Sequence, residues 1–342
     1  MSRLIRYSIL ILFLLLSSRF LSASPLYRGL MTIDGKPLYI SVYGKDETLP
    51  AMVCLPFGPG SSSLYLEESL PPLFNGILRL VFIDYYYSGR SVSSQRPLLY
   101  DRRPVEGLTP SDQADLILSL MTTLGIRQFG ILGHDFGAFV GLKLICKAPD
   151  KILFFAGVSP RLDYPADLSS LIEKLNESCN AMKNENTISG LKALEQQSRL
   201  SRLRGIKTLS PEGAETLFSL LGNFSEFYFH HPIEKKTRKT VEKLLKTGSF
   251  IPVHSVKEML PYLYSSSYYT SDEKGLLNMS PFPVLLLRGE SDRFFSASDD
   301  NDNKGLSYEM IPRASFFPML ENPRAFKKAL LDFLRIHGII DR

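Results

Sequence analysis

The sequence predicts an α/β protein with a mostly parallel sheet flanked by helices. Four continuous apolar runs have the length and composition of buried strands: residues 51–55, 80–84, 129–132 and 152–158. Segments with the helical spacing of apolar residues separate the later runs, and strands that alternate with helices are typical of a parallel sheet. The hydrophobic content of 44% and the charged content of 22% in 342 residues are those of an ordinary globular protein with a large core.

The amino-terminal half supplies the first elements. A strand is predicted at residues 38–42, where apolar and polar residues alternate. The next two strands each run into a loop, a Gly/Pro-rich one at residues 56–62 and a tyrosine-rich one at residues 85–91. A helix is then predicted to begin at Thr109-Pro110, with the threonine as its N-cap and the proline at its first position.

The strand at residues 129–132 leads into Gly133-His134-Asp135-Phe136-Gly137 and then into a helix-like segment. The two glycines leave room for a sharp strand-to-helix turn, and such a turn places Asp135 at its apex. The same five residues are also compatible with an ordinary turn after a strand. The rest of the chain decides between these interpretations.

The carboxyl-terminal half contains a long insertion and a return to the sheet. After the strand at 152–158, residues 164–280 are polar with helical stretches. A strand that begins at Pro283 ends in Gly-Glu-Ser-Asp, which places Asp292 directly after it. The last strand is predicted at residues 308–311, and Asn322-Pro323 begins a helix with an apolar stripe.

Residues 1–23 have the features of an export signal. Arg3 and Arg6 precede an unbroken apolar run at residues 9–16, and small residues follow up to Ala23. The run is shorter than the roughly 20 residues that span a bilayer comfortably. We therefore predict a periplasmic or secreted protein. An uncleaved amino-terminal anchor is the alternative, and this segment is the only predicted means of membrane association.

Charge and cysteine content narrow the function classes. The 40 Lys and Arg against 35 Asp and Glu give a net charge of +5 without any basic run, which argues against nucleic-acid binding. Cysteines and histidines show no metal-ligand spacing, so neither a metal nor another cofactor is predicted, and the expected partner is a small-molecule substrate. Cys54 and Cys146 lie in apolar runs, and both are predicted to be buried thiols.

Together these motifs resemble the α/β-hydrolase fold superfamily. The turn around Asp135 resembles its nucleophile elbow, Gly-x-Ser-x-Gly, with aspartate in place of serine, as in epoxide hydrolases and haloalkane dehalogenases. Residues 317–326 resemble the final motif of that branch. The resemblance implies an eight-stranded sheet, a core of residues 24–163 and 281–342, and a helical cap of residues 164–280 inserted after the sixth strand.

The resemblance also implies roles for particular residues. Asp135 would be the nucleophile and Asp292 the supporting catalytic acid, with Asp163 as the alternative position for that acid. Backbone N–H groups of Phe57 and Phe136 would form the oxyanion hole. The loop that contains Phe57 is also similar to the His-Gly-Gly-Pro-Gly segment of prolyl iminopeptidases.

The base position departs from the family pattern. The final motif of the Asp-nucleophile branch contains the catalytic histidine, and Phe316 stands there in this chain. A positioned general base contributes about 10²–10⁴-fold to such a step, and phenylalanine cannot accept a proton. The five histidines of the chain lie before the nucleophile, in the predicted cap and in the last helix: His134, His230, His231, His254 and His337. Either turnover is slow or a cap histidine replaces the base.

Residue types that the chain lacks narrow the class of substrate. The chain has no tryptophan to hold a leaving halide, which disfavours dehalogenation, and the site has neither the serine nor the histidine of a peptidase. An epoxide or a reactive ester fits best. Four cap tyrosines would donate to the opening oxygen or pack the cap against the core: Tyr262, Tyr264, Tyr268 and Tyr269. The hypothesis is a hydrolase with impaired turnover, and the alternative is an inactive or single-turnover binding protein. The oligomeric state stays open.

Overall fold

The structure is a computed structural model of the 342-residue chain. It describes residues 24–58, 60–92, 108–160, 164–183, 228–230, 274–278, 280–294 and 306–341, and the single positions 198, 213, 217 and 239. The predicted export signal at residues 1–23 lies outside the described residues. So do several predicted site residues: Asp163, His231, His254, Tyr262, Tyr264, Tyr268 and Tyr269.

One eight-stranded sheet forms the centre of the protein, in the order β1-β2-β4-β3-β5-β6-β7-β8. Two pairs, β1 with β2 and β2 with β4, are antiparallel, and every other neighbouring pair is parallel. The strands are β1 (Tyr27–Ile33), β2 (Lys36–Tyr43), β3 (Ala51–Leu55), β4 (Arg79–Asp84), β5 (Phe129–His134), β6 (Ile152–Val158), β7 (Val284–Gly289) and β8 (Ser307–Ile311). The mostly parallel α/β sheet predicted from the sequence is therefore confirmed.

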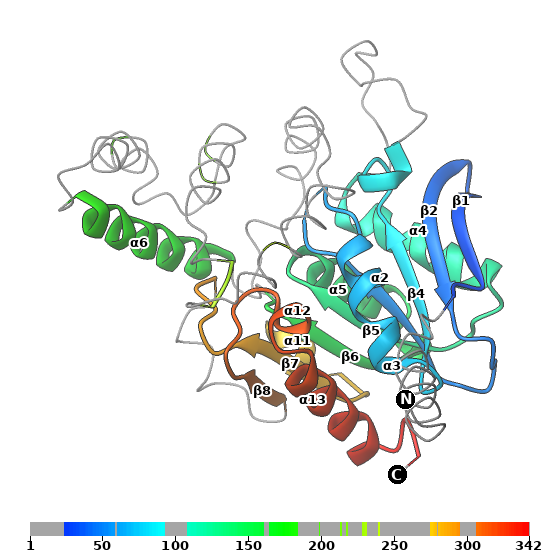
Figure 1. The fold of residues 1–342 in the computed structure, drawn as a ribbon. Coiled ribbons are helices and arrows are strands. Elements are labelled where there is room, and N and C mark those ends of the chain that lie inside the picture. The colour runs from blue at the N-terminus through cyan, green and yellow to red at the C-terminus, as the bar shows by residue number, and fades with distance from the viewer. Residues whose placement is uncertain are drawn as a thin grey trace, which may run out of the picture.

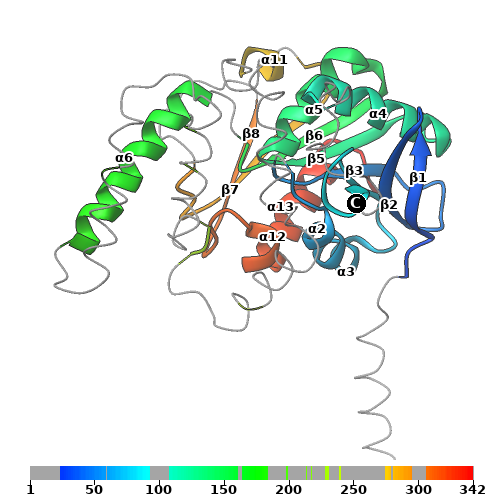
Figure 2. The ribbon, with the colours of Figure 1, turned by 90° about the horizontal axis from the view of Figure 1, so that it is seen from above.

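Helices cover both faces of this sheet. Figures 1 and 2 show α4 and α5 on one face and α2, α3, α12 and α13 on the other, while α6 stands away from the sheet beyond β7 and β8. The helices are α2 (Leu64–Ser69), α3 (Pro71–Phe74), α4 (Pro110–Thr123), α5 (Phe136–Lys147), α6 (Tyr164–Lys183), α11 (Lys274–Asn278), α12 (Pro318–Glu321) and α13 (Pro323–Ile336). Two short 3₁₀ helices are η2 (Gly89–Val92) and η4 (Pro149–Lys151). None of the helices in the described part of the chain has the length and apolar character to cross a membrane.

The predicted helix starts are confirmed in detail. The Thr109 hydroxyl accepts a hydrogen bond from the Asp112 backbone N–H, and the Asp112 carboxylate accepts one from the Thr109 backbone N–H. This reciprocal capping box satisfies two backbone donors that a helix end leaves open. At α13 the Asn322 side chain accepts a hydrogen bond from the Ala325 N–H. Both caps fix the residue at which their helix begins.

One burial prediction is wrong. Cys146 is exposed, whereas Cys54 and Cys179 are buried. Cys146 lies on α5, in the helix-like segment that the sequence predicted, and the helical period turns one position in each turn outward even when its neighbours are apolar. An exposed thiol matters for any labelling experiment with electrophiles, because it can react in its own right.

The close contact between α5 and β3 generates a stability prediction. A Cβ atom at Gly137 would overlap the carbonyl oxygen of Leu55 and lie 2.7 Å from that of Pro56. Gly137→Ala is therefore expected to lower the free energy of unfolding by about 2–3 kcal/mol in urea denaturation. Gly275→Ala is the matched control, because a Cβ there meets no atom within 4 Å. Equal stability of the two variants would contradict the packing described here.

Candidate functional site

The elbow between β5 and α5 has the predicted sharp geometry. Asp135 has φ 51° and ψ −109°, and only 2% of its surface is exposed. Such a conformation is costly for a residue other than glycine and persists only where the surroundings enforce it. The Asp135 N–H donates to the Val158 carbonyl at 2.9 Å, and its carbonyl accepts from the Ala138 N–H at 3.0 Å. The turn is thus fixed from both β6 and α5.

The two glycines of the elbow are required by packing. A Cβ at Gly133 would lie 2.6 Å from the backbone of Ala138, and a Cβ at Gly137 would overlap the chain at the end of β3. Only glycine permits these approaches. As a result the loop that follows β3 lies directly against the first turn of α5. The sequence interpretation of Asp135 as the apex of a tight elbow is therefore matched by the geometry.

The loop after β3 contacts Phe136, the residue that follows Asp135. A Cβ at Gly58 would lie 3.4 Å from the ring of Phe136, so the backbone next to Phe57 contacts the residue that follows Asp135. The Phe57 N–H donates a hydrogen bond to the Tyr65 hydroxyl at 3.0 Å. An oxyanion would need that donor at about the same distance. The Phe57 donor is therefore already engaged within the protein.

Tyr65 also contacts the histidine of the elbow. Its hydroxyl oxygen lies 2.7 Å from His134 Nδ1, and both side chains are fully buried. Burial, opposed in part by the Phe57 N–H and assisted by the charge of Asp135, raises the pKa of Tyr65 well above its usual value. The phenol therefore keeps its proton, and a hydrogen bond joins its oxygen to Nδ1, with the donor set by the tautomer of His134.

Asp292 lies near Asp135, as the sequence predicted for the acid after β7. Its carboxylate accepts a hydrogen bond from the Phe294 N–H at 2.9 Å, and its second oxygen is buried. Burial raises the pKa of Asp292, and the negative charge of Asp135 raises it further, against the effects of the Ser159 hydroxyl and the Phe294 N–H. The site therefore holds two buried carboxyl groups that influence one another.

Phe316 forms the centre of an aromatic cluster. Its ring centroid lies 4.4 Å from that of His134, 4.7 Å from Phe294 and 5.0 Å from Phe317. Phe57 and Tyr228 complete the contacts at 5.7 Å and 5.8 Å. Rings packed at these distances attract one another and exclude water. An apolar group that accepts no proton thus lies directly beside the elbow.

The described segment Tyr228–His230 joins the inserted region to this cluster. Phe229 stacks on Phe317 with ring centroids 6.0 Å apart. The His230 N–H donates to Glu321 at 2.7 Å, and His230 Nδ1 lies 2.6 Å from the Ser291 hydroxyl. Of the three cap histidines considered as a substitute base, His230 is the one within the described residues, and its ring is held by Ser291. His337, at the end of α13, packs instead on Phe333.

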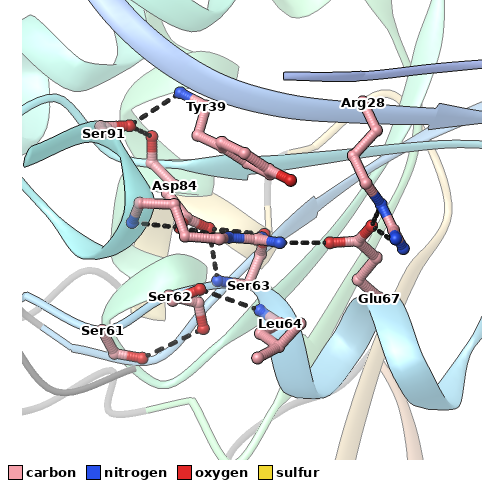
Figure 3. Close-up of polar contacts among 10 residues, drawn as sticks. Arg28, Tyr39, Ser61, Ser62, Ser63, Leu64, Glu67, Asp84 and Ser91 are labelled. Carbon is pink, nitrogen blue, oxygen red and sulfur yellow. Dashed lines mark hydrogen bonds and ion pairs between the residues drawn. The ribbon is translucent and has the colours of Figure 1, made fainter. Parts of the chain in front are cut away.

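A buried charge network supports the loops around the site, and the sequence reading missed it (Figure 3). Glu67 on α2 binds Arg28 from β1 and Arg90 from η2, each with an N–O distance of 2.6 Å. Arg90 also binds Asp84 at the end of β4, with its Nε 2.9 Å from the carboxylate. The Asp84 carboxylate accepts hydrogen bonds from the Ser63 N–H and hydroxyl, which lie at the start of α2. The network therefore ties α2 to β1 and β4.

Electrostatics within the network favour the ionised carboxylate. Burial alone would raise the pKa of Glu67, but hydrogen bonds and charge from Arg90, with the charge of Arg28, hold it below the usual value. Burial and the Glu67 charge raise the pKa of Tyr43 to about 12. The Arg90 guanidinium also lies 4.0 Å from the centre of the Tyr39 ring. The sequence around Arg90, Ser88-Gly89-Arg90-Ser91, carries no signal of the network beyond a charged residue six positions after the Asp84 that ends a buried strand.

A family model supplies the identification. The model described as the alpha/beta hydrolase fold matches residues 50–323. The chain belongs to this family. Comparison with curated proteins gives no match.

Solved structures of this fold extend over nearly the whole chain. A proline iminopeptidase-related protein from Thermus thermophilus is 22% identical, with a TM-score of 0.65 over 92% of this chain and 98% of its own. An esterase from Exiguobacterium antarcticum is 14% identical, with a TM-score of 0.58 over 90% and 100% of the two chains. A haloalkane dehalogenase from Bradyrhizobium elkanii is also 14% identical, with a TM-score of 0.59 over 92% and 98%. These likenesses show the α/β-hydrolase fold, and with the family match they support a hydrolase.

The described residues contain no cluster of three or more metal-ligating side chains.

The charge network generates a stability prediction. Glu67→Gln leaves the Arg28 and Arg90 guanidinium groups without their carboxylate, and breaking such a pair inside a protein costs several kcal/mol. Because Arg28 is partly exposed, we expect a loss of about 2–3 kcal/mol in the free energy of unfolding. The control is Asp332→Asn, which breaks the exposed pair with Lys328 on α13 and should leave the unfolding midpoint nearly unchanged. Equal midpoints for both variants would contradict a structural role for the network.

Glu321 generates a pH prediction. Burial, with a smaller contribution from the charge of Asp292, raises its pKa from the ordinary 4.5 to about 7, although backbone N–H groups of Ser315 and His230 oppose the rise. A carboxyl with a raised folded-state pKa binds more protons when folded, so stability falls as pH increases from about 4.5 to about 7. Each pKa unit is worth about 1.4 kcal/mol, so the fall approaches about 3 kcal/mol. Glu321→Gln should flatten this part of the stability curve, and an unchanged slope would disprove the assignment.

Proposed function

We propose that the protein is a hydrolase of the Asp-nucleophile kind, with Asp135 as the nucleophile and an epoxide or a reactive ester as the substrate. The observation that carries the proposal is the buried Asp135 at the apex of the elbow, at φ 51° and ψ −109°. A nucleophile on a backbone held in this way needs little reorganisation before it attacks a substrate. Most of the rate advantage of a preorganised nucleophile arises from this lack of reorganisation.

The proposed first step forms a covalent ester. A carboxylate oxygen of Asp135 attacks an epoxide carbon, a C–O bond of the ring breaks, and the released alkoxide takes a proton. With a reactive ester, the same oxygen attacks the acyl carbon, the acyl C–O bond breaks, and the departing alkoxide takes a proton, so that the intermediate is a mixed anhydride of Asp135 rather than an ester. Asp292, whose pKa is raised by burial and by the charge of Asp135, supports the site as the acid member. The cap tyrosines Tyr262, Tyr264, Tyr268 and Tyr269 remain our candidates for donating the proton.

The second step is the slow one in this proposal. Hydrolysis of the ester needs an activated water, and we propose that Phe316 occupies the position of the base that would activate it. The aromatic rings around Phe316 exclude water from that side of the elbow. His230 could act only after leaving the Ser291 hydroxyl. Turnover is therefore impaired at the stage of the covalent intermediate.

We also propose that the protein is exported after cleavage near Ala23, and that residues 164–280 form a cap on a core of residues 24–163 and 281–342. The described helix α6, which directly follows the β6 region and stands apart from the sheet, supports the second proposal.

A second candidate is a binding protein on a hydrolase scaffold, either inactive or limited to a single turnover. Two observations favour it. The aromatic cluster fills the side of the elbow where a base would act, and the Phe57 donor of the predicted oxyanion hole is engaged by Tyr65. Both features slow the hydrolysis of the covalent intermediate more than its formation. This candidate is therefore a protein that captures a ligand without releasing it.

Intact-mass spectrometry separates the two candidates. The mature protein is incubated with styrene oxide or 4-nitrophenyl acetate in a Cys146→Ala background, because the exposed thiol would itself react with these electrophiles. We expect a persistent adduct of one substrate-derived group per chain, and its loss in Asp135→Asn. Product without an adduct would show that another residue replaces the base. No adduct and no product would favour the inactive binding protein.

A further inference from the structure

We propose that residues 228–230 are a clasp that fastens the region between β6 and β7 onto the core, and that ionisation of Glu321 loosens this clasp. The inference goes beyond the proposed function, because it does not depend on whether Asp135 reacts. Two observations carry it. Each residue of the clasp has its own partner on the core, and one of these partners is a buried carboxyl group that holds two segments of the chain at once.

The apolar part of the clasp consists of two aromatic rings. The Tyr228 ring packs on Phe294 and Phe316, with ring centroids 5.4 Å and 5.8 Å apart. The Phe229 side chain is buried and stacks on Phe317 at 6.0 Å. Aromatic pairs at these distances attract one another, and their attraction does not depend on pH. The rings therefore supply a constant part of the hold.

The polar part of the clasp is at His230. Its backbone N–H donates to one oxygen of the Glu321 carboxylate at 2.7 Å, and its Nδ1 lies 2.6 Å from the Ser291 hydroxyl. The second oxygen of Glu321 accepts from the Ser315 N–H at 2.8 Å. A single carboxyl group thus joins the clasp to the loop before α12, and its charge state affects this junction.

A second attachment of the same region is independent of Glu321. On α6, Lys174 donates to the Arg293 carbonyl at 3.0 Å, and the Ser178 hydroxyl accepts from the Arg293 guanidinium at 3.2 Å. The loop at residues 291–294 therefore contacts both α6 and the clasp. Because the Lys174 contact is exposed, the clasp provides the more deeply buried of the two attachments.

Electrostatics link the clasp to pH. Burial, with a further contribution from the charge of Asp292, raises the pKa of Glu321 from 4.5 to about 7 against the opposing backbone N–H groups. Release of the clasp exposes this carboxyl to water, which favours its ionised form. The hold is therefore complete below about pH 4.5 and weakens as the pH rises to about 7.

Other charged groups around α12 do not reverse this direction. Glu67 on α2 is already paired with Arg28 and Arg90, and Asp332 on α13 is paired with Lys328. Asp292 opposes ionisation of Glu321. The titratable and charged groups on the clasp, on the loops after β7 and β8, and on α2 and α13 are His230, Glu290, Asp292, Arg293, Arg313, Glu67, Glu68, Arg324, Lys327, Lys328, Asp332 and Arg335.

Hydrogen exchange of the His230 amide measures the clasp directly, since this N–H is the donor to Glu321. The full chain is labelled with ¹⁵N-histidine and ¹⁵N-alanine, and the His230 signal is assigned by its loss in His230→Gln. Protection factors are corrected for the intrinsic exchange rate at each pH. We expect the protection of His230 to fall by up to about 70-fold between pH 5 and pH 8. Constant protection would overturn the proposal.

The matched control in the same protein is the Ala325 amide, which donates to the neutral Asn322 side chain close to Glu321. Its protection should not change with pH. An equal change at both amides would mean that the whole chain opens, and would overturn a local clasp.

Glu321→Gln identifies the titrating group. In this variant the His230 protection should be independent of pH, and a persisting pH dependence would assign the effect to another group and overturn the proposal. Phe229→Leu keeps Glu321 and removes only the ring stack. It should lower the protection of His230 about 2–10-fold at pH 5 and pH 8 alike. Unchanged protection in Phe229→Leu would show that residues 228–230 do not act together, and would contradict the clasp even if Glu321→Gln does not fold.

Discussion

The backbone at Asp135 is the constraint on which the rest of the site depends. A positive φ at a non-glycine residue is maintained here by hydrogen bonds to Val158 and Ala138 and by close approaches that only Gly133 and Gly137 allow. The approach at Gly137 brings the end of β3 against α5. The loop with Phe57 follows from that contact, and so does the meeting of Phe57 and Phe136. One turn thereby sets the positions of the nucleophile candidate and of its predicted oxyanion donors.

Apolar groups surround this turn. Phe316 packs against His134 beside the elbow, with Phe294 and Phe317 as its neighbours. The buried hydroxyl of Tyr65 is hydrogen-bonded within the protein, to the Phe57 N–H and to His134 Nδ1. Such satisfaction is stabilising, because a buried donor without a partner costs about 1–3 kcal/mol. Groups that are already hydrogen-bonded within the protein are also less available to bind a substrate. Slow product release and ligand capture therefore both follow from the same feature of the site.

The sequence predicted the sheet and the elbow because both rest on local patterns. Apolar runs marked β3 to β7, and the spacing of Gly133 and Gly137 marked the turn. The edge strand β1 was missed because its residues alternate between exposed and half-buried positions and one of them is Gly29. Cys146 was predicted to be buried because its neighbours are apolar, although the helical period of α5 turns this position outward.

The contacts that control the site could not be predicted, because they join residues far apart in the chain. Tyr65 meets His134 across 69 positions, and Glu67 meets Arg28 across 39. Neither partner carries a local signal of the contact. The same holds for the contact of His230 with Glu321, which links the inserted region to α12. Side chains that act through tertiary contacts need the fold before they can be recognised.

Tandem mass spectrometry of the digested adduct tests the central claim most directly, since it locates the residue that reacts. The Cys146→Ala protein is treated with styrene oxide, digested, and the modified peptide is sequenced. The account predicts an ester on Asp135, within the peptide that contains the end of β5 and the start of α5. Modification of Asp292 or of another carboxylate, with Asp135 untouched, would contradict it.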